Sequence, residues 1–138
     1  MGAARVILRG VVKPRERVVA GGISIHVVDV SRGVPAHGLR VTLRRLSDGA
    51  VATLFEGAVD ARGLLPMPPS IGDTPQPAGV YEAVFAIGAY YRARDPAAAT
   101  PAFVEDATFR FGIAEPSQHY HLPLKMTAWG YSLFRGGA

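Results

Sequence analysis

Hydrophobic and polar residues alternate along much of the chain. In the segment GISIHVVDV, Ile23, Ile25 and Val27 fall at every second position, and Ser24 and His26 lie between them. Successive side chains of a β-strand point to opposite faces, so this alternation is typical of a strand with one buried and one exposed face. We therefore predict a half-buried strand here, with both polar side chains on its outer face.

The same alternation recurs at intervals of about 8–12 residues, separated by short turns such as SDGA and DARG. The predicted strands are 22–30, 39–46, 51–59, 80–87, 107–113, 119–126 and 130–134. The segments 32–38 and 64–79 are predicted loops, and the second is too rich in proline for a central strand. Pro96 and Pro101 confine the one predicted helix to roughly Ala89–Asp95. Seven or eight short strands of this kind predict an all-β, two-sheet sandwich with one short helix.

The composition fits a single folded domain. Of the 138 residues, 49% are hydrophobic and only 19% are charged, which provides for a core and argues against wholesale disorder. The chain has no cysteine, so disulfides, thiolate metal sites and a cysteine nucleophile are excluded. We predict a basic N-terminal extension over residues 1–21, followed by one domain over residues 22–138.

The formal net charge of +4 comes from basic residues that are spread along the chain. Their densest cluster, VVKPRERVV, lies in the N-terminal extension, where we predict a solvated arm. Nucleic-acid binding would need a broader basic surface with interleaved aromatic residues, so we predict none. No stretch approaches the roughly 20 apolar residues of a membrane span. Arg9 interrupts the apolar run ARVILRGVV, which we do not interpret as a signal peptide, and the expected location is the cytoplasm.

The four histidines, His26, His37, His119 and His121, are the candidate chemical groups. His119 and His121 lie two residues apart on a predicted strand and therefore share a face. His26 lies on the polar face of a different strand. If both strands present the same outer surface, the imidazoles converge there and can serve as a general acid/base site. The alternative is that each histidine is structural or simply exposed, and we predict an exposed His37 in its Pro/Gly loop.

A pair of histidines two residues apart also suggests a metal site. The third ligand would have to be His26, and no established zinc-binding spacing accompanies the pair. We therefore predict no metal. The sequence also lacks a nucleophile elbow, a Gly-rich phosphate loop and a dinucleotide-binding fingerprint. From the residues alone, the function stays open.

Three motifs resemble a known family. The segment ISIHVVDVSRGVPAHGLRVTL is similar to the opening of the 5-hydroxyisourate hydrolases, the transthyretin-related enzymes of urate breakdown. GVYEAVFAIGAYYRAR resembles their middle strand and short helix. HYHLPLKMTAWGYSLFRGG resembles their end, where the pattern is H-Y-H-V-P-L-L followed by a closing Y-R-G-S. The motifs fall in order and extend from about Gly22 to Gly137.

The resemblance implies an eight-stranded transthyretin-like sandwich assembled as a homotetramer. It implies active sites at the interface between dimers, a small-molecule substrate, and no metal or cofactor. The implied reaction opens a cyclic ureide by attack of water on a ring carbonyl. His26 and His121 stand at the positions of the catalytic histidines. In the family an arginine holds the anionic substrate, and the serine of Y-R-G-S helps to close the site.

The chain departs from this pattern at the positions that hold the substrate. In VDARGLL, Leu64 stands where the family has its arginine. The tail reads Phe134-Arg135-Gly136-Gly137, so the tyrosine and serine hydroxyls of the motif are both lost. An arginine forms charge-assisted bonds with an anion, whereas leucine makes the pocket apolar and suits a less anionic ligand.

Two other side chains are candidates for replacing the missing cation. They are Arg62, two residues before Leu64, and Lys125 in the segment LKMTAW, which also places Trp129 near the predicted site. The predicted substrate-binding residues are therefore Arg62, Leu64, His119, Lys125 and the tail residues Phe134, Arg135 and Gly137.

Three functions follow as hypotheses. The first is a diverged enzyme that uses His26 and His121 for acid/base chemistry on a different cyclic substrate, as in a recruited biosynthetic ring opening or closure. The second is an authentic 5-hydroxyisourate hydrolase. The third is a non-catalytic, transthyretin-like binder of hydrophobic small molecules. Retention of both histidines favours an enzyme, because a pure carrier has no use for the pair.

Overall fold

The computed structural model describes residues 21–137, so the predicted N-terminal extension lies outside the described residues except for Gly21. Eight strands and two short helices follow one another along the chain. They are β1 (Ile23–Asp29), β2 (Val34–Pro35), β3 (Arg40–Ser47), β4 (Ala50–Ala58), α1 (Pro69–Gly72), β5 (Gly79–Phe85), α2 (Ile87–Arg92), β6 (Ala107–Ile113), β7 (Tyr120–Met126) and β8 (Tyr131–Leu133).

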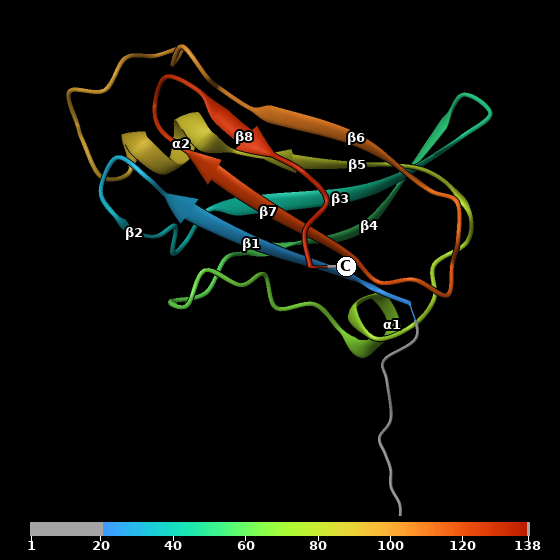
Figure 1. Ribbon diagram of the computed structural model, residues 1–138. Helices are drawn as coiled ribbons and strands as arrows, with labels where there is room; N and C mark the ends of the chain where they lie inside the picture. The colour runs from blue at the N-terminus through green and yellow to red at the C-terminus, as the bar shows by residue number, and fades with distance from the viewer. Residues whose placement is uncertain (1–20, 138) are drawn as a thin grey trace, which may run out of the picture.

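The strands form two four-stranded sheets that pack against each other (Figure 1). One sheet has the order β2-β1-β7-β8 and the other the order β4-β3-β5-β6. All pairings are antiparallel except that of β1 with β7, which is parallel and joins strands near opposite ends of the chain. The predicted all-β sandwich is confirmed.

The core lies between the sheets and follows the predicted alternation. On β1, Ile23, Ile25 and Val27 are almost fully buried, while the residues between them are half-buried on the outer face. Leu122 and Leu124 of β7 are buried beside them. Burying one such side chain stabilises the fold by about 1.5–3 kcal/mol. The alternation therefore fixes which face of β1 and β7 is left for chemistry.

The short elements differ from those predicted. Helix α2 begins at Ile87, before the expected start, because Ile87 and Tyr90 lie three residues apart and both pack into the core. Pro69 opens α1 inside the Pro-rich segment, in the first turn, where a missing N–H costs little. The segment predicted as a loop over 32–38 contains the two-residue strand β2. No helix among residues 21–137 is long and apolar enough to cross a membrane.

The end of β1 is fastened to α2 by a buried carboxylate. Asp29 is fully buried, and its two oxygens accept hydrogen bonds from Tyr90 Oη at 3.0 Å and Tyr91 Oη at 2.7 Å. Ser31 Oγ donates a third bond at 2.7 Å. Burial alone would raise the pKa of Asp29, but these hydrogen bonds outweigh it and the net pKa is lowered. The carboxylate is therefore kept ionised inside the fold.

Candidate functional site

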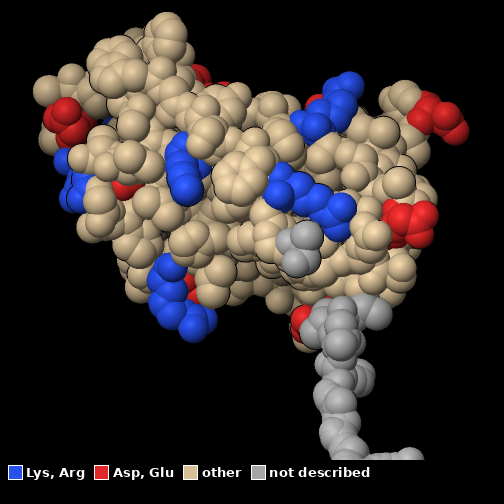
Figure 2. Space-filling model, in the orientation of Figure 1, with Lys and Arg blue, Asp and Glu red and all other residues tan. Residues whose placement is uncertain are grey.

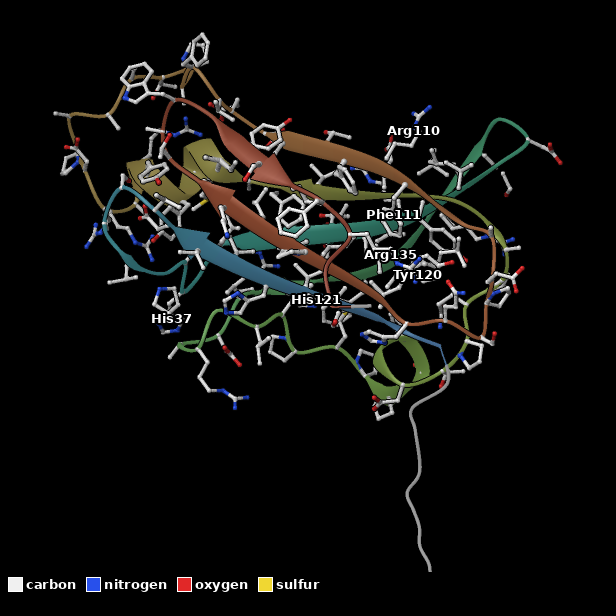
Figure 3. The ribbon with its side chains drawn as sticks, in the orientation of Figure 1. His37, Arg110, Phe111, Tyr120, His121 and Arg135 are labelled. Atoms are coloured by element: carbon white, nitrogen blue, oxygen red, sulfur yellow. The ribbon has the colours of Figure 1, made fainter. Side chains whose placement is uncertain are left out.

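The candidate site lies on the outer face of the sheet, where β1 and β7 run side by side. Ser24 is paired with His121, and His26 with Pro123. Because the side-chain period of a strand is two, these four residues all point away from the core. Adjacent strands lie about 4.8 Å apart and rise about 3.3 Å per residue, which separates the Cα atoms of His26 and His121 by roughly 8 Å. Both predicted catalytic histidines therefore share one surface, on which Figure 3 marks His121.

A serine connects the two histidines of the H-Y-H motif. Ser24 Oγ lies 2.8 Å from His119 Nε2 and 2.7 Å from His121 Nδ1. His119 Nδ1 lies 2.9 Å from the carbonyl oxygen of Gly21. Ser24 was not among the predicted site residues. Its position two residues before His26, on the same face of the strand, was the signal that could have identified it.

His26 is held by the turn that follows β4. Its Nε2 lies 3.0 Å from the carbonyl oxygen of Arg62, and because a carbonyl only accepts, this nitrogen carries the proton. The next residue, Gly63, has a φ of +89°, and a Cβ there would come within 2.7 Å of His26 Nε2. Only glycine therefore fits against the imidazole in this turn.

Leu64 lies directly beside His26. The backbone bonds Val27 N–Gly63 O, 2.8 Å, and Leu65 N–Ile25 O, 3.0 Å, bracket an antiparallel pair formed by His26 and Leu64. In such a pair the two side chains lie close together on the same face. Leu64, which we predicted to stand in place of an arginine, thus gives the imidazole an apolar neighbour.

The C-terminal tail returns over His121. Gly136 N donates to the carbonyl oxygen of His121 at 2.9 Å. A Cβ on Gly137 would lie 3.8 Å from the His121 side chain, at ordinary contact distance. The guanidinium of Arg135 lies 4.0 Å above the Tyr120 ring and donates to the carbonyl oxygen of His119 at 3.0 Å. Arg135 therefore braces the segment that carries both histidines.

The two candidate cations are placed differently. Lys125 lies on the outer face of β7, paired with Val28, and its Nζ is 5.9 Å from the centre of the Phe134 ring. The side chain of Arg62 is 79% exposed and its guanidinium lies 3.9 Å from the Asp60 carboxylate, so only its backbone carbonyl meets His26. Figure 2 shows Lys and Arg both near the middle and at the margins of this face of the molecule, with Asp and Glu mostly toward its edges.

Two further side chains, one of them the predicted neighbour Trp129, lie away from the site. His37 is exposed in the loop after β2, away from His121 in Figure 3. Trp129 follows the far end of β7, where its ring lies 6.1 Å from that of Phe103. These two exposed rings border an apolar cavity of about 300 Å³ that contains none of the site histidines.

The surroundings of His121 favour its neutral form. Burial lowers the pKa of His121, and any positive charge that the neighbouring His119 or His26 takes up lowers it further. A neutral imidazole accepts a proton, so His121 is suited to act as a base near neutral pH. Within residues 21–137, no group of three or more His, Asp or Glu side chains is arranged to hold a metal ion.

The chain is similar to known proteins over most of its length. The model of the HIUase/Transthyretin family matches residues 23–136. The 5-hydroxyisourate hydrolase of Pseudomonas aeruginosa is 36% identical over 116 residues, which cover 84% of this chain and 91% of that protein.

Two solved structures illustrate the similarity of fold. A crystal structure of (S)-allantoin synthase has a TM-score of 0.77 and 30% identity over 86% of this chain, which spans only 44% of the synthase chain. Sea bream transthyretin in complex with thyroxine has a TM-score of 0.71 and 25% identity, covering 84% of this chain and 95% of the transthyretin. The match of the family model over most of the chain, together with the hydrolase relative, shows that the chain belongs to the HIUase/Transthyretin family.

Proposed function

We propose that this protein is an enzyme that opens a cyclic, ureide-like substrate by general acid/base catalysis, without a cofactor. The observation that carries the proposal is the convergence of His26 and His121 on one face, each with one ring nitrogen held by a hydrogen bond. The hydrolase activity named for the Pseudomonas aeruginosa relative supports the same reaction class.

In the proposed reaction one imidazole acts as the general base and the other as the general acid. His121 removes a proton from water as the oxygen attacks a ring carbonyl carbon. The bond between that carbon and the ring nitrogen breaks, and the departing nitrogen takes a proton from Nδ1 of His26, which carries protons on both ring nitrogens for this step. Proton exchange with solvent then restores both histidines. Each such proton transfer contributes about 10²–10⁴-fold to the rate.

The proposed substrate is less anionic than 5-hydroxyisourate. Leu64 gives His26 an apolar neighbour where the family has an arginine, and the exposed guanidinium of Arg62 faces Asp60 instead of the site. Lys125, on the same face as both histidines, is the cation that we propose contacts the substrate. An apolar wall also suits a carrier of hydrophobic molecules, as the sea bream transthyretin–thyroxine complex illustrates, so turnover has to be tested directly.

The first prediction is that Leu64→Arg gains activity on 5-hydroxyisourate. The new guanidinium lies beside His26 and can pair with an anionic substrate. We expect kcat/KM to rise by roughly a hundredfold, which corresponds to about 2.7 kcal/mol of transition-state stabilisation. The measurement is the decay of freshly generated 5-hydroxyisourate, followed spectroscopically for wild type and variant.

Val51→Arg is the matched control, because it adds the same charge on the exposed β3–β4 hairpin. It should leave the rate unchanged. A wild-type rate as high as that of the family's hydrolases would show that the chain is an ordinary hydrolase of its family. Binding of an aromatic ligand with no turnover of any cyclic ureide, by wild type or variant, would instead favour the carrier.

We further propose that the protein assembles as a homotetramer, with the site at the interface between dimers. Strands β6 and β8 are each the last strand of their sheet, so each has an edge without a partner in the described chain. Such edges readily pair with a second copy. The exposed rings of Tyr131, in β8, and Phe134, just after it, would be covered by the assembly.

The second prediction follows from this assembly. Native mass spectrometry or light scattering at micromolar concentration is expected to give four times the mass of one chain. Dilution that dissociates the tetramer should also abolish activity, since the site then loses the surface opposite the histidines. A monomer with full activity would contradict the interface site.

A further inference from the structure

We propose that Ser24 sets the tautomer of His121 and so makes His121 Nε2 the atom that accepts a proton. The inference rests on the proposed acid/base role of His121, and it adds a positioning residue to that role. It follows from three hydrogen bonds that link Gly21, His119, Ser24 and His121 in a single chain.

This series of hydrogen bonds begins at the backbone carbonyl of Gly21, which can only accept a hydrogen bond. The carbonyl oxygen of Gly21 lies 2.9 Å from His119 Nδ1, so this nitrogen carries the proton. Gly21 has a φ of +82°, and a Cβ there would come within 2.5 Å of the Pro75 backbone, so this position requires glycine. On the next residue, the carbonyl of Gly22 is also held, by the N–H of Tyr120 at 2.9 Å.

The direction of the remaining bonds follows from this start. A neutral His119 with its proton on Nδ1 has a lone pair on Nε2, so the Ser24 hydroxyl donates to it across 2.8 Å. The single hydroxyl proton is then used, and Ser24 Oγ accepts from His121 Nδ1 across 2.7 Å. With its proton on Nδ1, neutral His121 keeps its free lone pair on Nε2.

The opposite order would require a charged histidine. If Ser24 donated to His121 Nδ1, it would have to accept a proton from His119 Nε2. His119 would then carry protons on both nitrogens while two other imidazoles lie nearby. The neutral order needs no such charge, and it is consistent with the lowered pKa of His121. Three neutral groups therefore admit one arrangement of protons.

The test is nitrogen NMR of the histidine rings in the full-length protein, without substrate. In ¹⁵N-labelled wild type above the pKa of His121, we expect Nδ1 to resonate as the protonated nitrogen and Nε2 as the unprotonated one. Ser24→Ala removes the acceptor, so the Nε2-protonated tautomer should become populated. Ser24→Thr keeps a hydroxyl at the same position and should restore the wild-type pattern. Ser47→Ala, at the exposed end of β3, is the matched control and should change nothing.

Activity provides an independent readout. On whichever cyclic ureide the wild type turns over, Ser24→Ala is expected to lower kcat roughly tenfold with little change in KM, and Ser24→Thr to recover most of it. An unprotonated Nδ1 in wild-type His121 would overturn the inference, as would an unchanged tautomer in Ser24→Ala. The predicted tautomers with no turnover of any cyclic ureide would leave the inference standing and would refute the proposed function instead.

Discussion

His121→Ala is expected to lower kcat by about 10²–10⁴-fold, the contribution typical of a general acid or base. The imidazole is half-buried on the outer face of β7, so its removal should leave the core and the thermal unfolding temperature nearly unchanged. The measurement is steady-state turnover of the best cyclic ureide substrate. His37→Ala is the matched control, because His37 is exposed in a loop away from the site. An active His121→Ala protein would contradict the assignment of the base.

The assignment of His121 as the base also predicts how activity falls at acidic pH. Burial lowers the pKa of His121, and any positive charge on His119 or His26 lowers it further, so the neutral base persists to a lower pH than in an ordinary histidine. Protonation of His121 should therefore not limit activity near neutral pH. Activity should fall as the pH drops through this lowered pKa, at a pH below 6.5.

The second large effect is on stability. Asp29→Ala is expected to lower the free energy of unfolding by about 3 kcal/mol, because it leaves the buried Tyr90 hydroxyl and its neighbours without their acceptor. Tyr91→Phe removes a single donor and should cost about 1 kcal/mol. Urea denaturation at neutral pH measures both changes. A loss under 1 kcal/mol for Asp29→Ala would show that the carboxylate contributes little to the fold.

The contribution of Asp29 should also depend on pH in a defined direction. Its pKa is lower in the folded protein than in the unfolded chain, so its stabilisation is fully present above the unfolded value of about 3.9. The stabilisation is lost as the pH falls through the folded value. The stability difference between wild type and Asp29→Ala should therefore shrink below about pH 4 and stay constant above pH 5.

The strands and their buried faces could be predicted from the sequence because each strand has one face in the core and one outside it. Ile25 and Val27 are buried as the alternation indicated. The short elements could not be placed as well. The start of α2 at Ile87 depends on packing between helix and sheet, and β2 exists only because two residues pair with the end of β1.

The sequence was enough to predict most residues of the candidate site, but not the contacts between them. Alternation placed His26 and His121 on outer faces, but the parallel pairing of β1 with β7, which brings them together, is a tertiary feature. That Arg62 meets His26 through its carbonyl and not its guanidinium depends on the turn at Gly63. The hydrogen bonds of Ser24 depend on the register between the two strands, which the pattern of a single strand does not specify.

The two parallel strands at the centre of their sheet, β1 and β7, divide their residues between two tasks. Every second side chain of β1 and β7 holds the sandwich together, and the side chains between them are free to carry chemistry. Evolution can therefore alter the outward residues, such as Ser24, one at a time with little damage to folding. Mutational drift on this face needs few steps to turn a hydrolytic surface into one that only retains its ligand, or the reverse.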